Sequence, residues 1–173
     1  MSHPGGTALK EPIRQPAKAR FGRRKWDKQP SQSAAVLIAT VGVPIPGSVI
    51  RAAVKLSGGD PVAVVSIARI YGSSLGLPNP GLMPTKAEMD DQRAQVAKAI
   101  ARLERAGVEA WGQVAATRRF AKTIAQAAEA RGVGQVLVVT PETARWRKVV
   151  EGDVARDVRR RLPKEVTVEG VTA

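Results

Sequence analysis

Residues 132–162 constrain the fold of this chain more than any other stretch, because they predict a strand, a loop and an amphipathic helix in direct succession. Residues 135–140, QVLVVT, form a short apolar run that stops at Pro141. Such a run is typical of a strand covered on both faces, as in a parallel sheet. From Trp146 onwards apolar residues recur at helical spacing, at Val149, Val150, Val154, Val158 and Leu162. Ligands of such sheets bind where strands end and helices begin, so residues 140–153 are the expected ligand site.

Apolar runs and amphipathic stretches alternate along the rest of the chain. We predict further strands at residues 35–42, 62–70, 108–116 and 166–171, of which the third is the least apolar. Between them lie helical patterns, after Ser48, after Thr85 and over residues 118–131. A regular order of strand and helix with short connections predicts an α/β fold, a right-handed, doubly wound parallel sheet with helices on both faces.

The helix termini carry recognisable signals. Ser48 is placed to cap the first helix, and two glycines follow the last apolar residue of that helix. Thr85 and Glu88 have the Thr-x-x-Glu spacing of a capping box at the start of a long helix. We interpret Glu88, Asp90 and Asp91 as complements to the dipole of that helix rather than as catalytic carboxylates.

The composition bounds the chemistry. With 173 residues and 43% hydrophobic content, the chain can form one α/β domain, residues 34–173, preceded by a basic arm, residues 1–33, that we expect to be disordered. Cysteine is absent and His3 is the only histidine, so disulfides, thiolate chemistry, zinc sites built on cysteine and histidine-based catalysis or metal binding are not expected. Ser48 and the threonines have no histidine and no obvious lysine partner in the sequence, and no apolar stretch reaches the roughly 18 residues of a membrane span. We expect a cytoplasmic protein without catalytic residues, metal or membrane partner.

The net charge of +13 is the strongest compositional feature. Residues 1–33 hold eight basic and two acidic residues, a net of +6, and residues 145–164 hold eight basic and three acidic residues, a net of +5. The candidate residues for contact with a polyanion are Arg20, Arg23, Arg24, Lys25, Trp26, Arg145, Arg147, Lys148, Arg159, Arg160 and Arg161. Trp26 would stack on bases while the cations hold phosphates. An acidic protein surface as partner, or an arm that is merely solvated, remains an alternative.

The succession of elements resembles the universal stress protein family over residues 34–171. The stretches that carry the resemblance are VLIATVGV, VVSIARIY, the long loop before the capped helix, and GDVARDVRRRLPKEVTV, which is similar to the closing helix and last strand of the family. The resemblance implies a five-stranded parallel sheet of order 3-2-1-4-5, with the first and fourth strands in the centre. Many members of the family are dimers, so the resemblance also implies a homodimer, and one branch of the family binds ATP between those central strands.

The motifs of that ATP-binding branch are altered in this chain. Val41 stands where the branch has an acidic residue, and the glycines of its loop G-x2-G-x9-G-[ST] fall on Thr140, Thr143 and Asp153. Gly152 supplies the last glycine if the loop is one residue shorter, and Asp153 then replaces the phosphate-binding hydroxyl and repels an anion. Glycine matters here because it lets backbone N–H groups approach phosphate closely.

The candidate ligand crevice therefore consists of residues at the ends of the first and fourth strands and in the loop that follows the fourth: Thr40, Val41, Gly42, Thr140, Thr143, Gly152 and Asp153. We expect Thr40 and Thr140 to line a small polar pocket there. Arg145, Arg147 and Lys148 would compensate in part for the missing glycines by offering charge. We expect no ordinary ATP binding and no other cofactor.

These observations predict a non-catalytic universal stress protein-like protein with a binding or regulatory role and a basic arm. One alternative is a nucleic-acid or ribosome-associated factor that binds RNA or DNA through the arm and the arginine-rich last helix. A second alternative is a nucleotide-binding or weakly hydrolytic stress protein. The charge favours the first alternative and the altered loop counts against the second.

Overall fold

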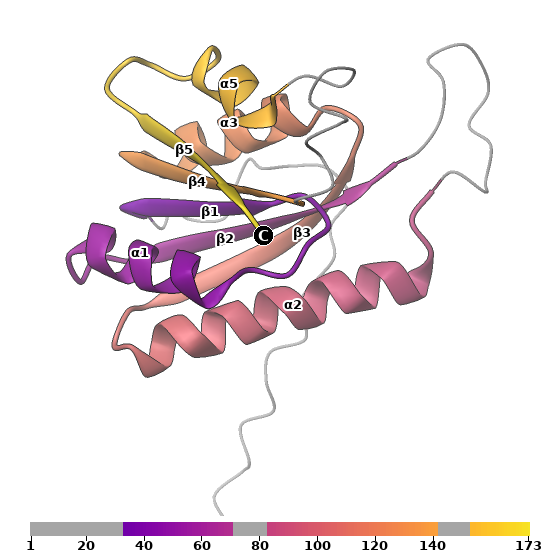
Figure 1. Cartoon of the computed structure of the whole chain (residues 1–173), viewed down its shortest axis with the longest axis horizontal. Coiled ribbons are helices and arrows are strands. Elements are labelled where there is room, and N and C mark those ends of the chain that lie inside the picture. Colours follow the sequence, from indigo (N-terminus) through magenta and orange to yellow (C-terminus); the bar gives the residue numbers. More distant parts are fainter. Residues whose placement is uncertain (1–32, 71–82, 142–152) are drawn as a thin grey trace, which may run out of the picture.

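A computed structural model describes residues 33–70, 83–141 and 153–173, in which five strands form one sheet with helices on both faces (Figure 1). The strands are β1 (Val36–Thr40), β2 (Val62–Arg69), β3 (Ala110–Thr117), β4 (Gln135–Thr140) and β5 (Thr167–Thr172). The helices are α1 (Gly47–Ser57), α2 (Lys86–Arg105), α3 (Phe120–Arg131) and α5 (Val154–Arg159). The predicted arm lies outside the described residues except for Ser33, so its disorder stays a prediction.

The strand order is β3-β2-β1-β4-β5 and every pairing is parallel. This confirms the predicted fold class, and each predicted strand overlaps an observed one. In the central pair, Val36 lies opposite Gln135 and Thr40 lies opposite Val139. The register places the carboxyl ends of β1 and β4 side by side, so both strands contribute to the expected ligand crevice.

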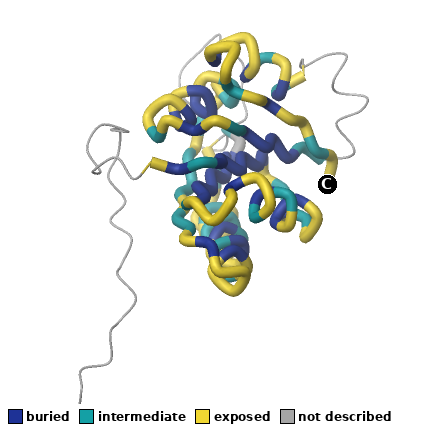
Figure 2. Tube along the Cα trace, turned by 90° about the vertical axis from the view of Figure 1, so that its left-hand side faces the viewer, coloured by how far each residue is buried: buried dark blue, intermediate teal, exposed yellow. Residues whose placement is uncertain are grey.

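Burial follows the apolar content of the strands. All five residues of β1 are buried, whereas no residue of β3 is, because β3 forms one edge of the sheet. At the other edge, Val168 is the buried residue of β5. Figure 2 shows the buried stretches running through the middle of the molecule. The less apolar third strand of the sequence is thus an edge strand.

Two apolar cores lie on opposite faces of the sheet. Helices α1 and α2 cover one face, where Val49 and Leu103 pack with side chains such as Ile38. Helices α3 and α5 cover the other face, where Ile124 and Val158 pack with alternate residues of the same strands. Alternation of side chains along each strand supplies both cores from one apolar run. Among the described residues, no helix is long and apolar enough to cross a membrane.

The start of α1 differs from the prediction. Pro46, not Ser48, is the N-cap residue, and no side chain caps the helix. Proline at φ −63° and ψ 151° holds extended backbone directly before Gly47, so the helix begins one residue before the predicted cap. At the other end Gly58 adopts a left-handed conformation with φ 61°, as the glycine pair indicates.

The last helix is shorter than its apolar stripe suggests. The stripe predicts helix through Leu162, but α5 ends at Arg159 and residues 160–162 form a turn. Val158 and Leu162 are nevertheless both buried, so the turn preserves the apolar contacts that the stripe requires. Residues 142–152 lie outside the described part, and the predicted start at Trp146 therefore stays a prediction.

Candidate functional site

The carboxyl ends of β1 and β4 mark the position where the strand order reverses direction, and open parallel sheets bind ligands at such a point. The backbone N–H of Val41 donates to the carbonyl of Val139 at 3.2 Å, which extends the contact between the strands by one residue. Gly42 follows with φ +69°, a conformation that disfavours side chains. Together they turn the chain away from the sheet at the predicted site.

The strand register places Thr40 and Thr140 on opposite faces of the sheet, so it gives no support to a pocket lined by both. Thr40 lies opposite Val139 in the register, so Thr140 is one residue further along β4. Because side chains alternate between the faces, Thr40 points to the face covered by α1 and α2, and Thr140 points to the opposite face. Thr40 is fully buried and its hydroxyl donates to the carbonyl of Val43, which satisfies it within its own loop.

A second buried hydroxyl lies beside Thr40. Ser66 of β2 lies opposite Thr40 on the same face, is fully buried, and donates a hydrogen bond to the side-chain oxygen of Gln92 in α2. An unpaired buried hydroxyl would be unfavourable, so this bond ties α2 to the sheet. Neither Ser66 nor Gln92 is among the candidate residues from the sequence, although a serine between Val65 and Ile67 in an apolar strand is a signal for a buried hydrogen bond.

Asp153 caps the first turn of α5. Its carboxylate accepts hydrogen bonds from the N–H groups of Ala155 at 3.0 Å and Arg156 at 3.4 Å. These amides are the groups that a phosphate at the start of the helix would contact. The Asp153 carboxylate thus occupies both N–H donors and places its own negative charge at the start of α5. Thr143 and Gly152, the other candidates from this loop, lie outside the described residues.

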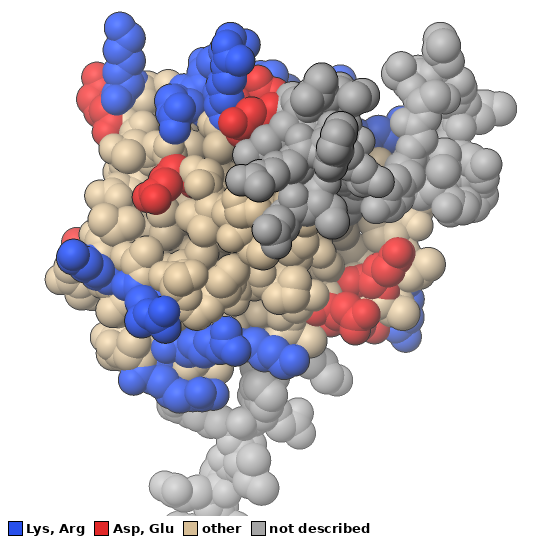
Figure 3. Space-filling model, in the orientation of Figure 1, with Lys and Arg blue, Asp and Glu red and all other residues tan. Residues whose placement is uncertain are grey.

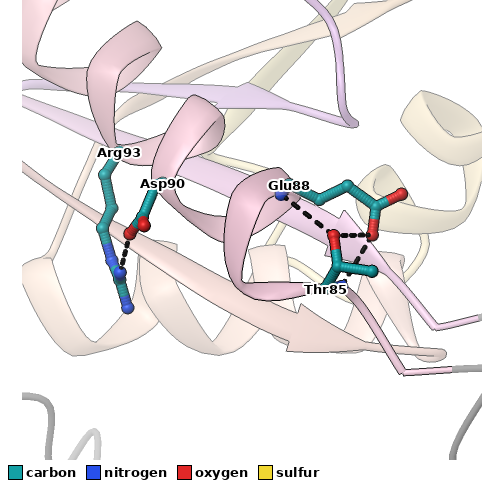
Figure 4. Close-up of polar contacts among 4 residues, drawn as sticks. All are labelled: Thr85, Glu88, Asp90 and Arg93. Carbon is teal, nitrogen blue, oxygen red and sulfur yellow. Dashed lines mark hydrogen bonds and ion pairs between the residues drawn. The ribbon is translucent and has the colours of Figure 1, made fainter.

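The carboxylates at the start of α2 contact their own helix. Glu88 accepts from the backbone N–H of Thr85 at 2.7 Å and from its hydroxyl at 3.0 Å, while the Thr85 hydroxyl accepts from the N–H of Glu88 at 3.2 Å (Figure 4). The predicted capping box is confirmed. The backbone hydrogen bond from Thr85, followed by that from its hydroxyl, lowers the pKa of Glu88 below 4.5. Asp90 pairs with Arg93.

No group of acidic or histidine side chains in residues 33–70, 83–141 and 153–173 has a geometry that would hold a metal ion. Glu88 and Asp90 have roles in helix capping and in an ion pair, as described above.

Three of the predicted polyanion contacts lie in the described part, at the end of α5. Arg159 donates to the carbonyl of Val168 in β5, so its guanidinium also holds the last helix against the last strand. Arg160 and Arg161 are exposed. Arg20, Arg23, Arg24, Lys25 and Trp26 of the arm, and Arg145, Arg147 and Lys148, lie outside the described residues.

Comparison with known proteins finds similarity at the level of structure alone. No family model and no curated protein matches the sequence. A protein of the universal stress protein family from Burkholderia pseudomallei is similar with a TM-score of 0.52 and 15% identity, over 81% of this chain and 96% of that one. The universal stress protein from Archaeoglobus fulgidus in complex with dAMP is similar with a TM-score of 0.51 and 18% identity, over 78% of this chain and 98% of that one. With a five-stranded parallel sheet of order β3-β2-β1-β4-β5, the chain has the fold of the universal stress proteins.

Proposed function

We propose that this chain is a non-catalytic binding protein that uses the universal stress protein fold as a scaffold and binds a polyanion of the nucleic-acid class. The observation that carries the proposal is the distribution of charge. The arm has a net charge of +6, and the exposed Arg160 and Arg161 follow a helix whose N-terminal donors are occupied by Asp153. Positive charge is thus carried by the arm and by exposed side chains directly after the last helix.

The second candidate is a nucleotide in the crevice between β1 and β4. The dAMP complex of the Archaeoglobus fulgidus protein favours it, since that protein has the same fold. Asp153 argues against it, because a carboxylate that accepts from Ala155 and Arg156 repels a phosphate and competes for the same N–H groups. The side chain of Val41, which is apolar and buried, also offers no polar group to a ligand.

One set of titrations separates the two candidates. The full chain is titrated with ATP and magnesium by calorimetry, and with labelled RNA and DNA by fluorescence anisotropy at about 50 mM salt. We expect binding to nucleic acid that weakens steeply as salt rises, and no binding of ATP in the low micromolar range. A chain that starts at Ser33 should bind more weakly and with a flatter salt dependence, because eight basic residues are lost.

Tight ATP binding that is abolished by changes at Thr140 would favour the nucleotide candidate. Failure of the full chain to bind either nucleic acid at low salt would contradict the proposal. The excess charge would then serve an acidic protein partner or solubility. Formation of a homodimer is a separate prediction that light scattering on the same samples tests.

A further inference from the structure

Five exposed cations lie on α1 and on the C-terminal half of α2. Arg51 and Lys55 are four residues apart in α1, and Lys98, Arg102 and Arg105 follow at spacings of four and three in α2, so each set lies on one side of its helix. In Figure 3, basic side chains gather over these two helices at the lower left. We call these five residues the α1–α2 basic face. None of them was singled out in the sequence.

The two rows of cations are neighbours in space. Arg102 donates from Nη1 to the carbonyl of Ile45 at 3.5 Å, and Ile45 lies two residues before the start of α1. Val49 of α1 and Leu103 of α2 belong to the same apolar core beneath the helices. The side of α2 that carries Arg102 therefore borders α1, and both rows contribute to one surface.

Little negative charge opposes this surface. None of the five cations forms an ion pair among the described residues, where the observed pair is Arg93 with Asp90. Glu104 lies about 200° around the helix from Arg102, at 100° per residue, and so faces away. Asp60, in the turn after α1, and Glu109, between α2 and β3, are also exposed, and counting both lowers the local net charge from +5 to +3. Figure 3 shows the acidic side chains of the N-terminal end of α2 well to the right.

The surface lacks the aromatic anchors that are enriched in protein–protein interfaces and in sites for unpaired bases. Trp111 and Phe120, the aromatic residues of the described part, pack against the core beneath α3 and α5, on the other face of the sheet. Leu56 is the exposed large hydrophobic residue of α1. A ligand here would be recognised by its negative charge, with no base stacking.

The dimensions suit a double helix. Lys98 and Arg105 are seven residues apart, or about 10 Å along the axis of α2, and packed helices lie about 8–10 Å apart. A nucleic-acid duplex carries about one negative charge per 1.7 Å of its axis. A duplex lying across both helices thus places several phosphates within reach of the long, flexible side chains.

We propose that the α1–α2 basic face binds the phosphate backbone of a nucleic-acid duplex without reading its sequence. The proposal rests on the ligand class given above and locates the contact on the folded domain rather than on the arm or the last helix. Each cation that neutralises a phosphate releases counterions, so the face contributes to both the affinity and its salt dependence.

The test uses the full chain and labelled 20-base-pair duplexes of RNA and DNA in two unrelated sequences. The variant carries Arg51→Gln, Lys55→Gln, Lys98→Gln and Arg105→Gln, and it keeps Arg102 because of its bond to Ile45. The matched control carries Lys86→Gln, Arg118→Gln, Arg119→Gln and Lys122→Gln, four exposed cations elsewhere on the domain. Both variants have a net charge of 13 − 4 = +9.

We expect the variant to bind duplex at least about tenfold more weakly at 100 mM salt. Its slope of log affinity against log salt should be shallower by about 3.6, since about 0.9 is lost for each phosphate contact. The control should change both quantities much less. A variant with Arg51→Lys, Lys55→Arg, Lys98→Arg and Arg105→Lys keeps the charge and should retain the affinity. Thermal unfolding establishes that all variants are folded.

Several outcomes would overturn this proposal while leaving the proposed function intact. Equal losses of affinity in the variant and the control would mean that net charge alone determines duplex binding. A loss only on removal of residues 1–32, or only with Arg160→Gln and Arg161→Gln, would place the ligand elsewhere. If polyglutamate binds as tightly as duplex, with the same loss in the variant, the partner is an acidic protein. Absence of nucleic-acid binding by the full chain would contradict both proposals.

Discussion

The two sides of α2 differ in what they contact. On the inner side Val96, Ala99 and Leu103 are buried against the sheet, and on the outer side Lys98 and Arg105 are exposed and form no ion pair with another described residue. Burial of apolar side chains is the main source of stability, whereas most exposed substitutions change it by less than about 0.5 kcal/mol. Stability and binding should therefore separate within one helix, and substitutions on each side test this.

The largest expected effect comes from the inner side. Leu103 is fully buried, and Leu103→Ala should lower the free energy of unfolding by about 2–5 kcal/mol, because the lost contacts leave a cavity. Denaturant unfolding measures the loss. Duplex binding by the fraction that remains folded should be unchanged, since Leu103 does not reach the basic face.

An exposed leucine provides the control for this substitution. Leu56 of α1 is 37% exposed, and Leu56→Ala should cost much less than Leu103→Ala. If both substitutions lower the free energy of unfolding equally, the greater burial of Leu103 does not make it contribute more to stability than Leu56. If Leu103→Ala abolishes binding while the protein stays folded, the two sides are not independent.

The next effect tests how closely α2 approaches the sheet. A Cβ atom on Gly112 of β3 would lie 2.5 Å from Val96 Cγ1 and 2.8 Å from the carbonyl oxygen of Val64. Gly112→Ala should therefore destabilise the protein by about 1–3 kcal/mol through overpacking. At Gly134 a Cβ atom would have no neighbour within 4 Å, so Gly134→Ala is the matched control and should not destabilise. Equal unfolding midpoints for both variants would show that the helix can move away from β3.

Much of the fold could be predicted from the sequence because local patterns determine it. The run at 135–140 agrees with β4, and the Thr85 and Glu88 spacing agrees with the start of α2. These signals act over a few residues, through burial and hydrogen bonds to nearby backbone. Ser48 failed as a cap because the preceding proline already fixes the extended backbone from which α1 begins.

The site was harder to predict because it depends on tertiary neighbours. Thr40 and Thr140 both end central strands, but only the register with Val139 shows that they point to opposite faces. Ser66 and Gln92 are 26 residues apart and meet only when α2 packs on the sheet. The basic face likewise joins cations of α1 to cations of α2, and no short motif connects them.

The smallest effect concerns the N-terminal end of α2, where charge serves the helix itself. Thr85→Ala removes the side-chain acceptor for the N–H of Glu88 and should cost about 1 kcal/mol, while Thr85→Ser keeps the hydroxyl and should cost less.

The Thr85 N–H that bonds to Glu88 lowers the pKa of that carboxyl, so the carboxylate form is favoured in the folded state. Its contribution is fully present above the ordinary pKa of 4.5 and is lost as the pH falls through the lower folded value. Chemical unfolding at pH values between 7 and 3 should therefore show a stability difference between the native chain and Glu88→Gln that shrinks on acidification. A difference that stays constant with pH would mean that the charge of the Glu88 carboxylate contributes nothing to stability. Duplex binding should be unaffected by Thr85→Ala and by Glu88→Gln, because this end of α2 lies outside the basic face.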